Sequence, residues 1–102
     1  MRYLGRSFPN QTPDESKDLP FDFSDYAHRN DCISSATWAI AVDTGSDASV
    51  ASRLIGDETH DSYISSHRVG TLQDGVRYKL TVTATMLSGE VLVLYSYVTG
   101  RA

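Results

Sequence analysis

The stretch "LQDGVRYKLTVTAT", residues 72–85, alternates apolar and polar side chains. From Tyr78 onward the even positions hold Tyr78, Leu80, Val82 and Ala84, whereas the odd positions hold arginine, lysine or threonine. A period of two is typical of a β-strand that rests one side on a core and turns the other to water. The stretch therefore predicts a turn followed by a half-buried strand.

Leu72, Gly75 and Tyr78 have the spacing of a tyrosine corner, in which the Tyr hydroxyl satisfies backbone groups upstream in the chain. At this point the sequence resembles immunoglobulin-like and fibronectin type III domains. In those domains the penultimate strand commonly opens with Leu, a Gly or Pro turn, and then Tyr. The corner predicts that residues 72–85 form the penultimate strand of a sandwich.

Other parts of the chain also read as short strands. They are residues 18–26 (an edge strand, because Pro20 lacks an amide donor), 32–42, 50–55, 62–69 and 90–98. The polar "GDETHD", residues 56–61, is expected to be a loop, and Ser88-Gly89 a two-residue hairpin turn. The pattern predicts an all-β fold, an immunoglobulin-like or fibronectin type III-like antiparallel β-sandwich of about seven strands. Its predicted core residues are Phe21, Phe23, Trp38, Ile40, Leu72, Tyr78, Leu80 and Val82.

The first 17 residues are polar and have no periodicity, so we expect residues 1–17 to be an extended arm and 18–102 the sandwich domain. The net charge is -4, and the nine Lys and Arg residues are scattered. This argues against nucleic acid or a membrane surface as a partner. With Cys32 as the only cysteine, and with neither a signal peptide nor an apolar run long enough to span a bilayer, we expect synthesis in a reducing cytoplasm.

The sequence contains no convincing catalytic, metal or cofactor motif. The loop that begins at Asp43 starts like a calcium loop, but Gly45 and Leu54 stand where ligands are required. His60, in the polar stretch 56–61, is a single imidazole among carboxylates, which is a poor zinc set. No nucleophile elbow or phosphate-binding loop is present. We therefore expect a protein that is not an enzyme and holds no cofactor.

The last strand is apolar on both sides, which indicates a central strand, a strand covered by another segment, or an interface. The N-terminal arm or a partner protein would explain it equally well. Tyrosine offers a large contact area with few torsions to freeze, and an extended arm can order on contact. The candidate partner-binding residues are Tyr3, Phe8, Pro9, Pro13, Val93, Tyr95 and Tyr97.

Three short motifs resemble a family of small bacteriophage virion proteins, the phage fiber–tail adaptors. They are Phe8-Pro9 with Pro13, then Phe21-Asp22-Phe23, then Ile33, Ser35, Thr37 and Trp38. The sequence departs from the family at residues 30–32, where Asn-Asp-Cys replaces the usual Gly-Asp, and in a longer loop after Asp43.

The resemblance implies a structural virion protein, made in the host cytoplasm, that joins tail fibers or another appendage to the tail or neck. Its partners would be fiber, tail or neck and portal proteins, together with copies of itself in a symmetric assembly. Capsid decoration, or a module that binds carbohydrate or the host surface, is the alternative.

Overall fold

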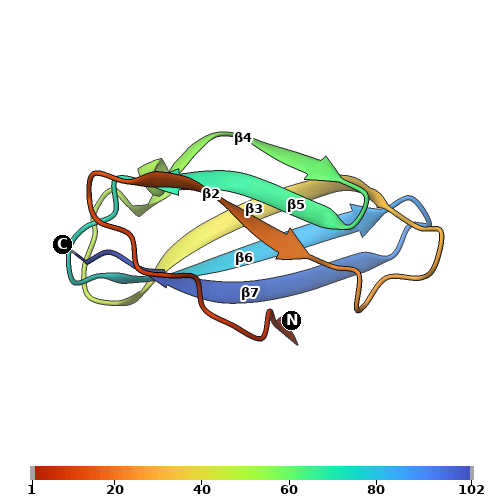
Figure 1. Cartoon of the computed structure of the whole chain (residues 1–102), viewed down its shortest axis with the longest axis horizontal. Coiled ribbons are helices and arrows are strands. Elements are labelled where there is room, and N and C mark those ends of the chain that lie inside the picture. The colour runs from red at the N-terminus through yellow and green to blue at the C-terminus, as the bar shows by residue number, and fades with distance from the viewer. Residues whose placement is uncertain (1, 102) are drawn as a thin grey trace.

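The computed structural model describes residues 2–101, which form two β-sheets stacked face to face (Figure 1). A short 3-10 helix, η1, covers Val50–Arg53. The strands are β1 (Arg2–Tyr3), β2 (Ser16–Asp22), β3 (Ile33–Thr44), β4 (Leu54–Asp61), β5 (Ile64–Gly70), β6 (Arg77–Met86) and β7 (Val91–Thr99).

One sheet has the strand order β1-β7-β6-β3 and the other the order β2-β5-β4. All neighbours are antiparallel except β1, which runs parallel to β7. The chain crosses between the sheets from β1 to β2, from β2 to β3, from β3 to β4 and from β5 to β6, so each sheet combines segments distant in sequence. This architecture confirms the predicted immunoglobulin-like sandwich.

The core lies between the two sheets and is built from the inward-facing residues of both. Six of the predicted core residues are at most 1% exposed: Phe21, Phe23, Leu72, Tyr78, Leu80 and Val82. Trp38 is 8% exposed and stands edge-on to the Phe21 ring, with the ring centroids 5.0 Å apart. Ile40 is only partly buried and packs against the margin of this cluster.

The edge strand β4 differs from the prediction for this part of the chain. Residues 50–53, expected to begin a strand, form η1, whereas the predicted polar loop 56–61 lies within β4. Thr59 to Asp61 pair with Ser66 to Ile64 of β5 across a turn that has Ser62 at a φ of 52°. Backbone pairing with β5 supports this strand, together with Leu54, which packs against the core, and Glu58, which accepts a hydrogen bond from Ser65.

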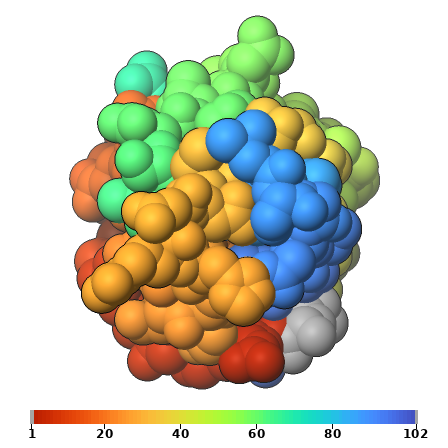
Figure 2. Space-filling view, turned by 90° about the vertical axis from the view of Figure 1, so that its right-hand side faces the viewer, coloured from red at the N-terminus to blue at the C-terminus, as the bar shows by residue number. Residues whose placement is uncertain are grey.

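The loop between β6 and β7 is longer than the predicted two residues. The Met86 amide donates to the Glu90 carbonyl at 2.8 Å, so three residues lie between them, and Gly89 takes a φ of 95°. This loop lies beside the segment 23–32 at one end of the molecule (Figure 2), where the Ser88 hydroxyl donates to the Asp31 carboxylate at 2.7 Å.

The N-terminal arm runs along the outer edge of β7. Backbone amides of Leu4, Phe8 and Gln11 donate to carbonyls of Tyr95, Tyr97 and Thr99 at 2.8, 2.9 and 3.0 Å. Phe8 is 7% exposed and its ring centroid lies 5.6 Å from that of Phe21. The arm is therefore held both by backbone hydrogen bonds and by an apolar anchor.

Candidate docking surface

Three tyrosines cluster on the outer surface of the β1-β7-β6-β3 sheet. Tyr3 lies beside Tyr95 in the parallel pairing of β1 with β7, and Tyr97 follows on the same side of β7. Ring centroids of Tyr3 are 5.5 Å from Tyr95 and 6.1 Å from Tyr97, and Tyr95 lies 5.9 Å from Tyr97. We call the outer surface of this sheet the tyrosine face.

The centre of the tyrosine face carries no charge. Its outward residues on β3, β6 and β7 are Ser35, Thr37, Ala39, Ala41, Thr81, Thr83, Thr85, Val91 and Val93. Exposed edge strands, such as β3 in this sheet, often carry charged side chains that discourage contact with other proteins. A broad surface of small and aromatic side chains instead suits contact with a flat partner surface.

Two cations stand at one end of the tyrosine face and order its rings. The Arg77 guanidinium lies 4.0 Å from the Tyr97 ring centroid, and the Lys79 ammonium lies 4.5 Å from that of Tyr95. Arg77 also lies 3.6 Å from the Asp43 carboxylate. Such contacts stabilise the rings by about 0.5–1 kcal/mol each at exposed sites, which reduces the side-chain entropy left to lose on binding.

The predicted partner-binding residues occupy different environments. Tyr3 is 38% exposed, and Val93, Tyr95 and Tyr97 are half-buried on the tyrosine face. Pro9 is exposed in the arm, and Pro13 is half-buried in the turn before β2. Phe8 lies in the core, so it cannot contact a partner while the arm stays in place.

A polar cluster closes the predicted tyrosine corner at the opposite end from the segment 23–32. The Tyr78 hydroxyl accepts a hydrogen bond from the Gln73 amide at 3.0 Å, as the corner predicts, and donates to the Asp47 carboxylate at 2.6 Å. Arg53 holds both oxygens of that carboxylate, at 2.9 and 3.1 Å. Arg53 and the Tyr78 hydroxyl hold the pKa of Asp47 well below its ordinary value, while burial raises the pKa of Tyr78.

This cluster predicts a specific acid sensitivity. Because the pKa of Asp47 is depressed in the folded chain, its contribution to stability is complete above the ordinary value of 3.8 and is lost as the pH falls below it. We expect Asp47→Asn to lower the free energy of unfolding at pH 7, and we expect its difference from the wild type to shrink between pH 4 and pH 2. Urea unfolding across this range checks it, with Asp25→Asn as an exposed control. A constant difference would contradict the assignment.

A second series of hydrogen-bonded polar side chains connects the core to β4, but the order of its residues does not suit catalysis. The Trp38 indole donates to the Ser65 hydroxyl at 2.9 Å, and Ser65 donates to the Glu58 carboxylate at 2.8 Å. The His60 Nδ1 lies 3.0 Å from both oxygens of the Glu58 carboxylate. A serine nucleophile needs a histidine base beside it, whereas here the carboxylate stands between the two. Ser65 is also fully buried, which suits a structural role.

Within residues 2–101 no three His, Cys, Asp or Glu side chains gather closely enough to hold a metal ion. The same part of the chain has no helix long and apolar enough to cross a membrane. The alternation of the last strand predicted that Tyr95 and Tyr97 share one side of β7. It did not predict their contacts with Arg77 and Lys79, because these diagonal contacts depend on the register of β6 with β7.

A two-sheet sandwich with an aromatic outer face that carries no charge at its centre belongs to the broad class of structural and binding domains. Comparison with known families is more specific. The model of the family described as podophage GP4 fiber-tail adaptor protein gp77 matches residues 11–95, and the chain belongs to this family of structural phage proteins, which places it in the virion. This confirms the family resemblance, although Phe8 and Pro9 precede the matched region. No curated protein and no solved structure matches the chain.

Proposed function

We propose that the chain joins a tail fiber, or another appendage, to the tail or neck of the phage particle by docking proteins on its surface. Family membership supports this role, and the tyrosine face is the observation that carries the docking mechanism. The partners are other virion proteins, and the chain acts in several copies within a symmetric assembly. Repetition converts modest single contacts into a strong attachment.

The tyrosine face is formed before a partner arrives. Its rings contact one another and the cations of β6, and the arm that carries Tyr3 is fixed to β7 by the backbone of Leu4, Phe8 and Gln11. A surface that is already ordered loses little entropy on binding, so more of the contact energy remains as affinity. Tyrosine is also among the residues that most often dominate the binding energy of an interface.

The backbone edge of β7 offers a second means of contact. β1 pairs only with Leu94 and Tyr95, so within residues 2–101 the segment Val91–Val93 is paired with β6 alone. Val91 is 58% exposed, and a shallow pocket lies between this segment, Arg2 and Tyr26. A strand of a partner protein fits such an edge because it completes the backbone hydrogen bonds of the sheet.

Binding to carbohydrate or the host surface draws little support from the aromatic residues. Trp38 is buried and bonded to Ser65, so it cannot stack on a sugar ring. The tyrosines would have to perform that task. Glycan binding that is lost on changing Tyr95 or Tyr97, with assembly into particles intact, would favour this alternative over docking.

The test is co-expression of the chain with the fiber, tail and neck or portal proteins of the same phage, followed by purification and measurement of the complexes. We expect Tyr95→Ala with Tyr97→Ala to weaken assembly by more than about tenfold, because both rings lie on the tyrosine face. The matched control is Tyr95→Phe with Tyr97→Phe, which keeps the contact area and should retain most of the binding. Equal binding by the alanine and wild-type chains would contradict the proposal.

A further inference from the structure

The two outer faces of the sandwich differ in charge. On the β2-β5-β4 sheet the outward charged residues are Asp18, Asp22, Asp57, Asp61 and Arg68. Four carboxylates and one guanidinium give this surface, which we call the acidic face, a net charge of -3 out of -4 for the whole chain. The tyrosine face has Arg77 and Lys79 against Asp43, a net charge of +1.

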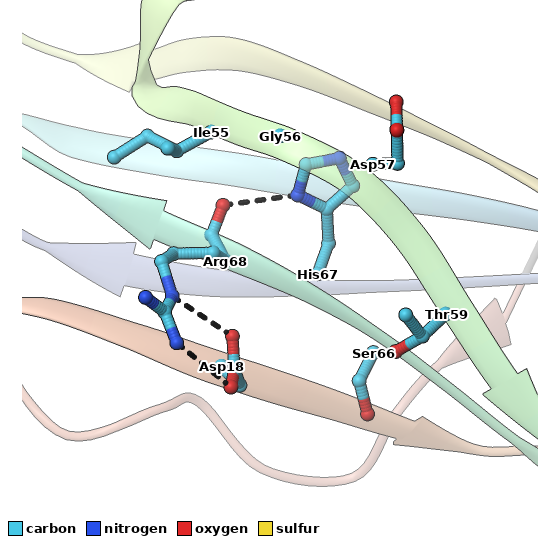
Figure 3. Close-up of a pocket in the computed structure, with 8 residues that line it drawn as sticks. All are labelled: Asp18, Ile55, Gly56, Asp57, Thr59, Ser66, His67 and Arg68. Atoms are coloured by element: carbon cyan, nitrogen blue, oxygen red, sulfur yellow. Dashed lines mark hydrogen bonds and ion pairs between the residues drawn. The ribbon is translucent and has the colours of Figure 1, made fainter.

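The acidic face is hollowed where the pairing of β4 with β5 breaks. Ile55 pairs with Arg68, but the next pair is Thr59 with Ser66, so three residues of β4 stand opposite His67 alone. Gly56 adopts a φ of 73° in this bulge. The resulting hollow opens between the strands and is lined by Asp18, Ile55, Gly56, Asp57, Thr59, Ser66, His67 and Arg68 (Figure 3).

A hydrogen-bond acceptor on a largely buried side chain lines the hollow. His67 is 7% exposed, and its Nδ1 lies 3.0 Å from the Arg68 carbonyl, which requires Nδ1 to carry the proton and to donate it (Figure 3). Nε2 is then an acceptor, and within residues 2–101 it has no hydrogen-bond partner. Asp57 adds a carboxylate at the rim. A lone acceptor beneath a carboxylate suits a cationic group that donates several hydrogen bonds, such as a lysine ammonium.

The tyrosine face carries such a group. Arg77 is held by Asp43, whereas Lys79 forms no ion pair within residues 2–101, and its ammonium lies over the Tyr95 ring. Its long side chain stands on the outer surface of β6. Lys79 is thus a cation without a carboxylate. In the hollow, Arg68 already pairs with Asp18, whereas Asp57 is a carboxylate without a cation within residues 2–101.

We propose that the occupant of the acidic face is the tyrosine face of a second copy of this chain, with Lys79 of that copy entering the hollow beside His67 and Asp57. The inference rests on the proposed function and names the partner of its docking surface. The two faces lie on opposite sides of one rigid sandwich, so the same contact repeats from copy to copy. Such a head-to-tail contact closes into a ring when the rotation between neighbours allows it.

The size of the faces agrees with this contact. The molecule measures 42 × 23 × 20 Å, so a sheet face offers an area close to the ~800 Å² that each partner buries in an interface of standard size. Within a ring the two ends of the sandwich stay free. Fiber and tail proteins would then dock on the loops there and on the exposed edge at Val91–Val93.

The experiment is sedimentation of the purified full chain over a range of concentrations at low and high salt. We expect the wild type to self-associate at low salt, and we expect added salt to weaken the association. Asp57→Lys with Asp61→Lys removes the acidic face, and Lys79→Glu removes the cation. Each variant alone should associate at least tenfold more weakly than the wild type, whereas an equimolar mixture of the two should associate again, because it offers one intact face of each kind.

Three results would overturn the inference. They are a wild type that stays monomeric at every concentration, an acidic-face variant that associates as well as the wild type, and a mixture that remains monomeric. Thermal unfolding of both variants controls for folding, and little change is expected because the substituted residues lie on the surface. If the wild type stays monomeric but still binds fiber or tail proteins through Tyr95 and Tyr97, this inference fails and the adaptor function stands. Loss of both activities would overturn the adaptor function as well.

Discussion

We expect Trp38→Ala to lower the free energy of unfolding by about 3–5 kcal/mol, the largest effect of any single change considered for this chain. The indole is 8% exposed and contacts Phe21 from the facing sheet, with ring centroids 5.0 Å apart. It also donates to the Ser65 hydroxyl at 2.9 Å. Alanine would leave a cavity between the sheets and would leave the buried Ser65 without its donor, and both changes destabilise the fold.

Urea unfolding followed by far-UV circular dichroism measures this effect. Trp38→Phe keeps an aromatic ring against Phe21 and should cost less, whereas Thr37→Ala, on the exposed side of the same strand, should change stability by no more than about 0.5 kcal/mol. A loss below about 1 kcal/mol for Trp38→Ala would place the indole outside the core. It would also return Trp38 to the candidates for a binding face.

The second large effect is expected at the arm. Phe8→Ala should lower the stability of the isolated chain by about 3 kcal/mol, because Phe8 is 7% exposed and packs on Phe21. Its removal should also loosen the backbone bonds of Leu4 and Gln11 to β7. Unfolding in urea measures the first effect, and amide hydrogen exchange at Leu4 and Gln11 measures the second.

Pro9→Ala is the matched control, because Pro9 is the exposed neighbour of Phe8 in the same arm. The control should leave both readouts nearly unchanged. If Phe8→Ala leaves the isolated chain as stable as before, the arm does not dock until a partner is present. Phe8 would then regain the partner-binding role suggested by its sequence.

Much of the fold could be predicted because the alternation of apolar and polar residues along a strand shows directly which side of that strand is buried. The even residues of β6, from Tyr78 to Ala84, are all buried, and Trp38 and Leu94 continue the same layer on the neighbouring strands β3 and β7. The hydroxyl of Tyr78 meets the Gln73 amide, as the spacing of the tyrosine corner indicates. In these strands each local pattern agrees with the packing that surrounds it.

What could not be predicted depends on contacts between distant parts of the chain. β4 has no apolar alternation, and only its pairing with β5 reveals it as a strand. Gln11 reads as a polar arm residue, yet it is fully buried and its amide nitrogen donates to the Val69 carbonyl at 3.0 Å. Asp47 and Arg53 lie in a turn-rich segment far in sequence from Tyr78, to which the Asp47 carboxylate is bonded.

The candidate binding surfaces were also predictable only in part: the tyrosines of the last strand were, and the acidic face was not. The outward parity of Val93, Tyr95 and Tyr97 could be read from the last strand, because alternation assigns sides without a structure. The acidic face could not be found this way, since Asp18 and Asp57 share a surface only through the pairing of β2 and β4 with β5. The bulge opposite His67 leaves no signal in the local sequence, although Gly56 permits its positive φ.

A cryo-EM reconstruction of the intact phage particle, at a resolution that shows side chains, tests the docking account most directly. We predict that this chain lies between the fiber or appendage and the tail or neck, with Tyr95 and Tyr97 buried against a neighbouring protein in every copy. A particle in which the tyrosine face of each copy points into solvent, or from which the chain is absent, would contradict the account.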